Sequence, residues 1–338
     1  MDIPGEKLII KLWESLADKG IGGLLKPWQT RREGRAAVDV KKLEMLELAQ
    51  AQREADAIRA GTRLLLANGA IIDAPDPSHQ GTTGAAETQV LLPLNDVISR
   101  NRMADAVRRE INITKAVVAA EVDLETDSSF PPEESVSEDW LFRWRDGAAT
   151  VSGEDLQSLW GRVLAGEVRS PGTFSLRTLE FLRNLSQSEA RVIERVAPFV
   201  VQGTIFRDPE VLSSVHGIRF DELLALQELG LLSGLDGIGL QMEWRTQLAG
   251  VIGFHRLLRG RGRVLLVKHS ETERTLELKV FTVTTMGQQV FPLANAQVNE
   301  QWLRLVGQEI KAMGFDVSIG GYQEISKGVI LPRNLTAL

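Results

Sequence analysis

The stretch that decides the fold runs from Glu138 to Ser186 and contains EDW at 138–140, LWGRVLAGE at 159–167 and FSLRTL at 174–179. We call this stretch the signature block. Its tryptophans and leucines recur at the spacing of one helical face, which is typical of amphipathic helices packed on one another. The block therefore predicts three short helices whose large apolar residues lie in a core.

The central helix of the block is expected to follow Ser152, whose hydroxyl is a good N-cap, and to stop at Gly166. Its apolar stripe consists of Leu156, Leu159, Trp160, Val163 and Leu164. A stripe of this kind predicts a buried face.

A core does not require the polar residues of the block, which are Glu138, Asp139, Arg162, Glu167 and Arg177. Two interpretations stay open. The arginines can pair with the carboxylates and hold the helices in register, or the set can face a partner molecule. An internal salt bridge is the favoured role for each arginine.

The signature block resembles that of bacterial proteins related in pattern to the abortive-infection alpha (Abi-alpha) family. The resemblance extends to the turn at 229–232 (LGLL), the segment 283–287 (VTTMG) and the run at 23–32 (GLLKPWQTRR). It implies a winged-helix-like C-terminal domain. In that domain the segment 229–232 would be the turn of the second helix, and the segment 283–287 would lead from the wing into the next helix. The resemblance also implies an association with phage defence, and it carries no catalytic motif.

Composition limits the classes of protein and of functional site that the chain can represent. The chain has 338 residues, 43% of them hydrophobic and 25% charged, which is ordinary for two or three globular domains. Its net charge of −6 restricts any nucleic-acid contact to local patches. The absence of cysteine excludes disulfides, thiolate metal sites and a Cys nucleophile. With no signal-like or membrane-spanning run, we expect a cytoplasmic protein, with the inner-membrane surface as the alternative location.

We predict a mainly α chain with a smaller α+β C-terminal part, that is, a helical bundle followed by a winged-helix-like domain. The expected parts are an amphipathic helix with a Gly/Pro-Trp turn at 1–30, a long charged helix at 31–72, a linker at 73–89, a helical domain at 90–202 and the winged-helix-like domain at 203–338. The linker assignment rests on its prolines, glycines and hydroxylated residues.

Single elements are predicted by periodicity and capping residues. They are helices at 5–19, 94–122, 221–229 and 298–313, a capping box at 186–189, a left-handed stop at Gly230, and strands at 264–267, 275–284 and 315–319. Asp221 is the expected N-cap of the helix at 221–229, and Pro198 should bend the helix that starts at the capping box. In the helix that should cover much of 94–122, one face is shared by Val107, Ile111, Thr114 and Val118.

The first helix offers an apolar face to another surface. The residues concerned are Leu8, Ile9, Leu12, Trp13 and Leu16, with Trp28 beyond the helix. Three occupants stay open: a membrane surface, a second subunit, or the helical core of the same chain. Acidic residues on the polar face weaken attraction to anionic lipid, so packing against protein is favoured.

A basic segment is the candidate nucleic-acid patch. Its residues are Arg256, Arg259, Arg261, Arg263 and Lys268. The presumed recognition helix at 221–229 has acidic residues and no Arg or Lys, so base reading is not expected. Contact with nucleic acid would use this patch alone, and a solvated basic loop is the favoured alternative.

Enzymatic motifs are not found. The four histidines lack metal-ligand spacing, and the chain has neither a GxSxG elbow nor a Walker-type lysine. We therefore predict no catalytic residue, metal, cofactor or small-molecule substrate.

The favoured hypothesis is a non-enzymatic bacterial phage-defence or stress-associated protein that acts through self-assembly or contact with another defence protein. The alternatives are a membrane-surface effector that uses the first helix and a nucleic-acid-binding winged-helix protein that uses residues 256–268.

Overall fold

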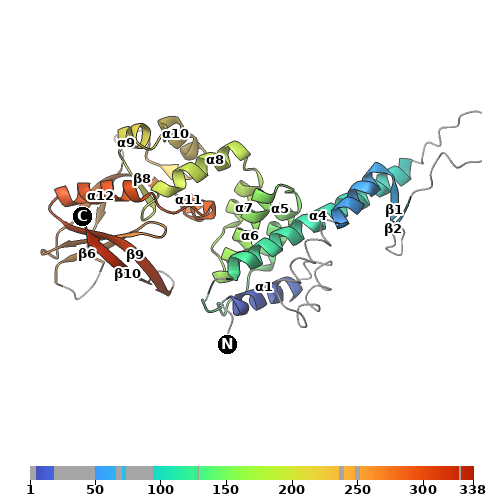
Figure 1. Cartoon of the computed structure of the whole chain (residues 1–338), viewed down its shortest axis with the longest axis horizontal. Helices are drawn as coiled ribbons and strands as arrows, with labels where there is room; N and C mark the ends of the chain where they lie inside the picture. The colour runs from blue at the N-terminus through green and yellow to red at the C-terminus, as the bar shows by residue number, and fades with distance from the viewer. Residues whose placement is uncertain are drawn as a thin grey trace, which may run out of the picture. The chain divides into compact units, whose positions relative to one another are not determined.

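The computed structural model describes residues 5–18, 50–65, 71–73, 94–125, 127, 129–235, 240–247, 252–326 and 329–338. The chain divides into two compact units, Met1–Leu179 and Glu180–Leu338, which we call unit 1 and unit 2. The coarse prediction is confirmed, because helices come first and antiparallel sheets follow among helices in unit 2 (Figure 1). Within these described ranges, no helix is both long and apolar enough to cross a membrane.

The described part of unit 1 consists of helices, the loops between them and one small hairpin. Its elements are α1 (Glu6–Asp18), a helix over residues 50–60, β1 (Arg63–Leu65), β2 (Ile71–Asp73), α4 (Leu94–Leu124), α5 (Glu138–Ala149), α6 (Glu154–Arg169) and the first part of α7 (Leu176–Arg183). The long helix α4 is central, since α1, α5 and α6 all pack against it (Figure 1).

The burial of α4 differs from the single face that the sequence predicts. Val107 and Val118 are only partly buried, whereas Ile113, Val117 and Leu124 are fully covered. A helix with neighbours on several sides buries residues around its circumference. The predicted helix is therefore present, and its buried residues include Ile111 and Thr114 of the predicted face.

Glycine lets α6 approach α4 closely. A Cβ atom at Gly161 would lie 2.6 Å from the Cβ of Ala119 and 2.9 Å from the carbonyl oxygen of Ala116. Gly166 has a similar role, because its Cβ would lie 2.7 Å from the Phe174 ring. The helix continues past Gly166 to Arg169, so the prediction that this glycine ends it was wrong.

The tryptophans of the signature block join its helices. The indole N–H of Trp140 donates to the Phe174 carbonyl at 2.7 Å, and that of Trp144 donates to the Trp160 carbonyl at 2.9 Å. All three rings are buried. Each ring thus fills the core while two of the indole donors are satisfied. The N-cap of α6 is Gly153 instead of the predicted Ser152.

The charged helix predicted at 31–72 lies mostly outside the described residues. Its described part is helical over 50–60, and Gly61 follows in the left-handed region with φ of 76°. β1 then pairs with β2 in an antiparallel hairpin, where the sequence predicts helix. Gly61 is the turn residue that permits this change of direction. Residues 74–89 of the predicted linker also lie outside the described residues.

Unit 2 contains the remaining elements. They are the end of α7, α8 (Gln187–Val196), η2 (Ala197–Phe199), β3 (Thr204–Phe206), α9 (Pro209–Ser214), α10 (Phe220–Glu228), β4 (Leu232–Ser233), β5 (Leu240–Trp244), β6 (Phe254–Arg259), β7 (Val264–His269), β8 (Leu276–Val283), α11 (Thr285–Val290), η3 (Phe291–Ala294), α12 (Glu300–Ala312), β9 (Asp316–Ser326) and β10 (Val329–Ala337). The predicted capping box at Ser186 is present, and the helix tightens into η2 at Pro198.

The described strands of unit 2 form two antiparallel sheets. β8 lies between β3 and β4 in the first sheet and also pairs with β5. The second sheet has the order β10-β9-β7-β6 (Figure 1). The strand predicted at 315–319 is β9, which extends to Ser326. The strand after it, β10, was not predicted from the sequence. A hairpin with little burial lacks the clear alternation that identifies a strand.

The boundary between the units falls within α7, earlier than the predicted boundary after residue 202. The reason is the packing of α8, which contacts α10 and η3 of unit 2. Its buried side chains, Ile193 and Val196, belong to the core of that unit.

Four aromatic rings form part of the unit 2 core. His216 lies 5.0 Å from Phe199 and 5.8 Å from Trp302 between ring centroids, and Phe206 lies 6.1 Å from Trp302. The Nε2 atom of His216 and the Nε1 atom of Trp302 are buried without a hydrogen-bond partner among the described residues. Burial lowers the pKa of His216 below its ordinary value of 6.5.

We expect Gly161→Val to destabilise unit 1 by about 1–3 kcal/mol, because the new side chain overlaps backbone atoms of α4. Urea unfolding followed by tryptophan fluorescence measures this change. Gly153→Ser is the matched control, because a Cβ there meets nothing within 4 Å and serine is a favourable N-cap. Equal stability of Gly161→Val and wild type would show that α4 and α6 do not need the close approach.

We expect acid to destabilise unit 2 through His216. Its pKa is lower in the folded chain than in the unfolded chain, so the unfolded chain binds the proton first as the pH falls below about 6.5. Stability is then greatest above that pH and declines below it. In His216→Phe, the loss of unfolding free energy between about pH 8 and about pH 5.5 should be smaller than in wild type. An equal loss in both proteins would contradict this assignment.

Candidate functional site

Glu167 is the buried carboxylate of the signature block, with 2% of its surface exposed. Its Oε1 accepts a hydrogen bond from the Gly172 amide at 2.6 Å, and its Oε2 accepts one from the Phe174 amide at 2.9 Å. Burial raises the pKa of Glu167, although these amide hydrogen bonds oppose the rise. The side chain therefore holds the loop between α6 and α7.

The other polar residues of the block occupy different surroundings. Glu138 and Asp139 are exposed in the first turn of α5, Arg177 is exposed on α7, and Arg162 is half-buried on α6. Backbone amides hold Glu167, in place of the arginine that the sequence analysis favoured. Glu167 was one of three carboxylates that the sequence offered to the arginines, and on the last turns of α6 it reaches the following loop instead. Pairing of an arginine with Glu138 or Asp139 stays a prediction.

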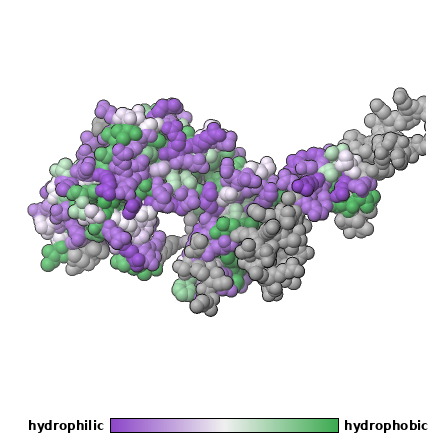
Figure 2. All heavy atoms as spheres, viewed as in Figure 1, coloured by the Kyte–Doolittle hydropathy of each residue, from purple (hydrophilic) through white to green (hydrophobic). Residues whose placement is uncertain are grey.

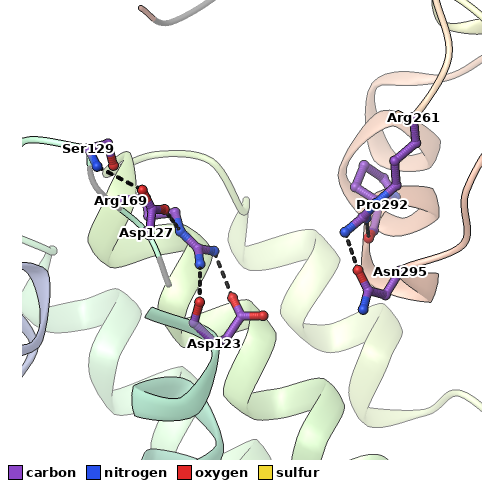
Figure 3. A network of polar contacts seen from close by, with 7 residues as sticks. All are labelled: Asp123, Asp127, Ser129, Arg169, Arg261, Pro292 and Asn295. Atoms are coloured by element: carbon purple, nitrogen blue, oxygen red, sulfur yellow. Dashed lines mark hydrogen bonds and ion pairs between the residues drawn. The ribbon is translucent and has the colours of Figure 1, made fainter. Parts of the chain in front are cut away.

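Arg169 makes the salt bridges that the sequence analysis missed. Its guanidinium lies 2.5 Å from Asp127 and 2.8 Å from Asp123, and it also donates to the Asp123 carbonyl at 2.7 Å (Figure 3). Burial raises the pKa of Asp127, but hydrogen bonds from Ser129 and the pairing with Arg169 outweigh it and lower the pKa. The residue types alone gave no signal for this pairing, because α6 and α4 are distant in sequence.

The first helix packs on its own chain. Leu8, Leu12 and Leu16 are at most 1% exposed, and the indole N–H of Trp13 donates to the Glu121 carboxylate of α4. Ile9 is partly buried at the edge of this face. Of the three occupants that the sequence left open, the helical core of the same chain covers the face. Trp28 lies outside the described residues.

Two residues of the basic segment are fixed by neighbours across unit 2. Arg261 donates to the Pro292 carbonyl at 2.6 Å and also to the Asn295 side chain (Figure 3). The Arg263 guanidinium lies 2.9 Å from the Glu300 carboxylate at the start of α12. Both guanidinium groups therefore hold the β6–β7 turn against other elements.

The remaining basic residues lie on the strands of that hairpin. Arg256 is half-buried, burial lowers its pKa, and it donates to the Arg245 carbonyl at 3.3 Å. Arg259 lies 3.7 Å from the Glu324 carboxylate, and Lys268 is exposed opposite Asp316 on β9. The nucleic-acid patch stays a prediction, with Glu324 and Asp316 of β9 beside two of its charges.

A cavity of about 470 Å³ opens in unit 2 beside the β6–β7 turn. Its polar lining comes from Gln202, Arg259, Arg261, Gln288, Tyr322 and Glu324. Its apolar lining includes Val200, Val283 and Phe291. Ligand cavities combine an apolar wall with a few convergent polar groups, so this is the candidate functional site of unit 2.

The turn at Gln202 and Gly203 builds one wall of the cavity. Both residues have positive φ, 50° and 71°. The Gln202 amide donates to the Arg259 carbonyl at 2.8 Å, and the Arg259 amide donates to Oε1 of Gln202 at 3.1 Å. These bonds fix the Arg259 backbone at the rim. The sequence signals only a Gly turn here, so the cavity could not be predicted.

The segments 229–232 and 283–287, on which the resemblance also rests, contact each other in unit 2. The Thr284 hydroxyl donates to the Gly230 carbonyl at 2.6 Å, and the Thr284 amide donates to the Leu231 carbonyl at 3.0 Å. A Cβ at Gly287 would lie 2.2 Å from the Leu231 carbonyl oxygen, so the contact requires glycine. Gly230 has φ of 74°, as expected of a left-handed stop.

The helix before that turn has its N-cap two residues earlier than predicted. Its N-cap is Arg219, and the Arg219 amide donates to the buried carboxylate of Glu222 at 2.9 Å. Arg195 of α8 pairs with the same carboxylate at 2.7 Å. Asp221, the predicted N-cap, instead pairs with the Arg219 guanidinium at 2.9 Å on the surface.

Among the described residues, no group of His, Asp and Glu is arranged to hold a metal ion.

Residues 98–205 match a family described as a protein of unknown function, DUF2806. The matched segment begins in α4, includes the whole signature block and ends in β3. No curated protein and no solved structure matches the chain significantly.

We expect Glu167→Gln to destabilise unit 1 by about 1–3 kcal/mol. The glutamine side chain has one acceptor oxygen where the carboxylate has two, so the backbone N–H of Gly172 or Phe174 would face an NH₂ group. Chemical unfolding compares this variant with Glu133→Gln, an exposed loop acid of the same unit that should change stability little. If both variants match wild type, the carboxylate does not hold the α6–α7 loop.

Proposed function

We propose that this chain is a non-enzymatic protein of bacterial phage defence or stress response that acts by binding protein, first of all further copies of itself. The link to defence rests on the resemblance of the signature block to Abi-alpha proteins. The mode of action rests on surfaces of unit 2, and on strand β10 above all.

Within this proposal, unit 2 contains a winged-helix-like core. The order of the elements supports this assignment: one helix (α8) and one strand (β3) are followed by two helices (α9 and α10) and then by the strands β4 and β8. The last strand, β8, lies between the other two. The β6–β7 hairpin is then an insertion in the wing between β4 and β8. The turn after α10 and the N-terminus of α11 meet at Thr284, as the resemblance implies.

Charge favours protein over nucleic acid as the partner. The sequence of α10, FDELLALQE, has no basic residue, and Asp221 and Glu228 are exposed on it. A helix of this charge is repelled by phosphates in a DNA groove. Arg261 and Arg263 are engaged within unit 2, which leaves few charges of the basic segment for a phosphate backbone.

The exposed edge of the second sheet carries the proposal. β10 is the terminal strand in the order β10-β9-β7-β6, and three of its apolar residues are largely exposed: Val329 at 55%, Leu331 at 47% and Leu335 at 39%. Figure 2 shows hydrophobic residues at the end of the β9–β10 hairpin. An exposed apolar edge strand is a template for pairing with another chain.

A second copy is the partner that fits this edge. Arg333 is the single charged residue among the nine of β10, so two such strands can approach with little repulsion. Pro332 has no N–H and limits the pairing to a short segment around Val329 and Leu331. We therefore expect a reversible association of modest strength. The membrane alternative has less support, because the apolar face of α1 is buried in unit 1.

Light scattering at micromolar concentration should give wild type a mass above that of one chain. Val329→Lys combined with Leu331→Lys should return the mass to that of one chain, because charges on an edge strand oppose pairing. Ile252→Lys is the matched control: Ile252 is 92% exposed in the same unit but lies outside β10, so this variant should associate like wild type.

Two outcomes would contradict the proposal. Wild type with the mass of one chain at every concentration excludes self-assembly as its mode of action. Tight binding of duplex DNA that weakens steeply with salt and is lost in Arg259→Gln would favour the nucleic-acid alternative.

A further inference from the structure

We propose that the cavity beside the β6–β7 turn binds a small organic oxyanion, in which a phosphate or carboxylate group is joined to a flat apolar body. This ligand site goes beyond the assembly role of β10. Its volume of about 470 Å³ lies within the range of cavities that enclose small molecules.

The charge of the lining favours an anion. Arg259 and Arg261 contribute two positive charges and Glu324 one negative charge, which leaves +1. A guanidinium group presents five N–H donors in a planar fork that matches the oxygen atoms of a carboxylate or phosphate. The lining thus has both the sign and the donor geometry that an oxyanion requires.

Arg259 is the residue best suited to bind the anionic group. Its guanidinium nitrogen lies 3.7 Å from the Glu324 carboxylate, beyond the 2.7–2.9 Å typical of a charge-assisted hydrogen bond. Its side chain is 42% exposed, so an incoming anion can reach it. Arg261 is held more firmly, by Pro292 and Asn295, and adds a fixed positive charge.

The opposite part of the lining favours an apolar body. Val283 and Phe291 line the cavity and belong to the core of unit 2. Tyr322, the single tyrosine of the chain, lines it from β9. A ring joined to the anionic group could therefore cover apolar surface while its charge stays beside Arg259.

Backbone conformation gives an independent indication of a built site. In the described backbone, three residues other than glycine have positive φ, and two of them support this cavity. Gln202, with φ of 50°, forms its wall, and Asn295, with φ of 55°, holds Arg261. Uncommon backbone conformations of this kind cost energy and concentrate at functional sites.

Phenyl phosphate is the probe that combines both features, and isothermal titration calorimetry with the full-length protein measures its binding. We expect saturable binding at millimolar or lower concentration, with weaker binding of inorganic phosphate and of phenol. Benzoate as a further probe distinguishes a carboxylate site from a phosphate site. Arg259→Gln should weaken the binding of the preferred anion at least about tenfold, because one charge-assisted contact is lost.

Two variants make the test specific. Arg245→Gln is the matched control, since Arg245 is an arginine of the same unit that is 83% exposed and lies outside the cavity lining. It should bind as wild type does. Ala296→Phe places a ring where a small residue lines the cavity, and it should abolish binding. Circular dichroism establishes that each variant is folded.

The proposal is overturned if neither phenyl phosphate nor benzoate binds saturably in the millimolar range. It is also overturned if binding is the same in folded Arg259→Gln as in wild type, or if Arg245→Gln weakens binding as much as Arg259→Gln does. Light scattering of Arg259→Gln reports on assembly separately, so this site and the β10 surface can fail independently.

Discussion

The close approach of α6 to α4 at Gly161 is the constraint on which unit 1 depends. Because no side chain separates the two backbones there, the neighbouring large residues of α6 can fill the space on either side. The ring of Trp160 lies over Gly147 of α5, where a Cβ would be 2.1 Å from it. The ring of Phe174 covers Gly166. The alternation of glycine with bulky residues in the signature block is therefore a packing pattern, which accounts for its composition without a catalytic role.

Unit 2 depends on a comparable junction around β8. Its strand neighbours are β3 on one side and β4 and β5 on the other, and Thr284 at its end ties α11 to the turn after α10. The β6–β7 turn is attached to this framework through Gln202 and Arg261. These attachments place Arg259 in one cavity lining with Val283 of β8 and Phe291 of η3. The same fold leaves β10 at the edge of the second sheet, and β10 contributes no residue to the lining of the cavity.

Local physical chemistry explains which parts could be predicted. Helical periodicity identified α1, α6 and α12, and Ser186 with Glu189 identified a capping box that depends on residues three apart. Helical periodicity could not identify the partners of α4, because a helix surrounded by neighbours has no single apolar face. A short apolar run identified β7 and alternation identified β8, which are largely buried. Neither signal identified β10, whose residues are mostly exposed. The winged-helix-like arrangement stays a proposal.

The sequence by itself determined where several helices begin and end within a few residues, among them α1, α4 and α12, because caps, glycines and periodicity act over one or two turns. Only the tertiary structure decided which charges meet. Arg169 pairs with Asp123 and Asp127, Glu167 binds backbone amides, and Arg259 faces a cavity. Electrostatic and hydrogen-bonding interactions depend on distances of a few ångströms between residues far apart in the chain. Those distances are set by how closely the helices and sheets pack, and glycines such as Gly161 control that packing.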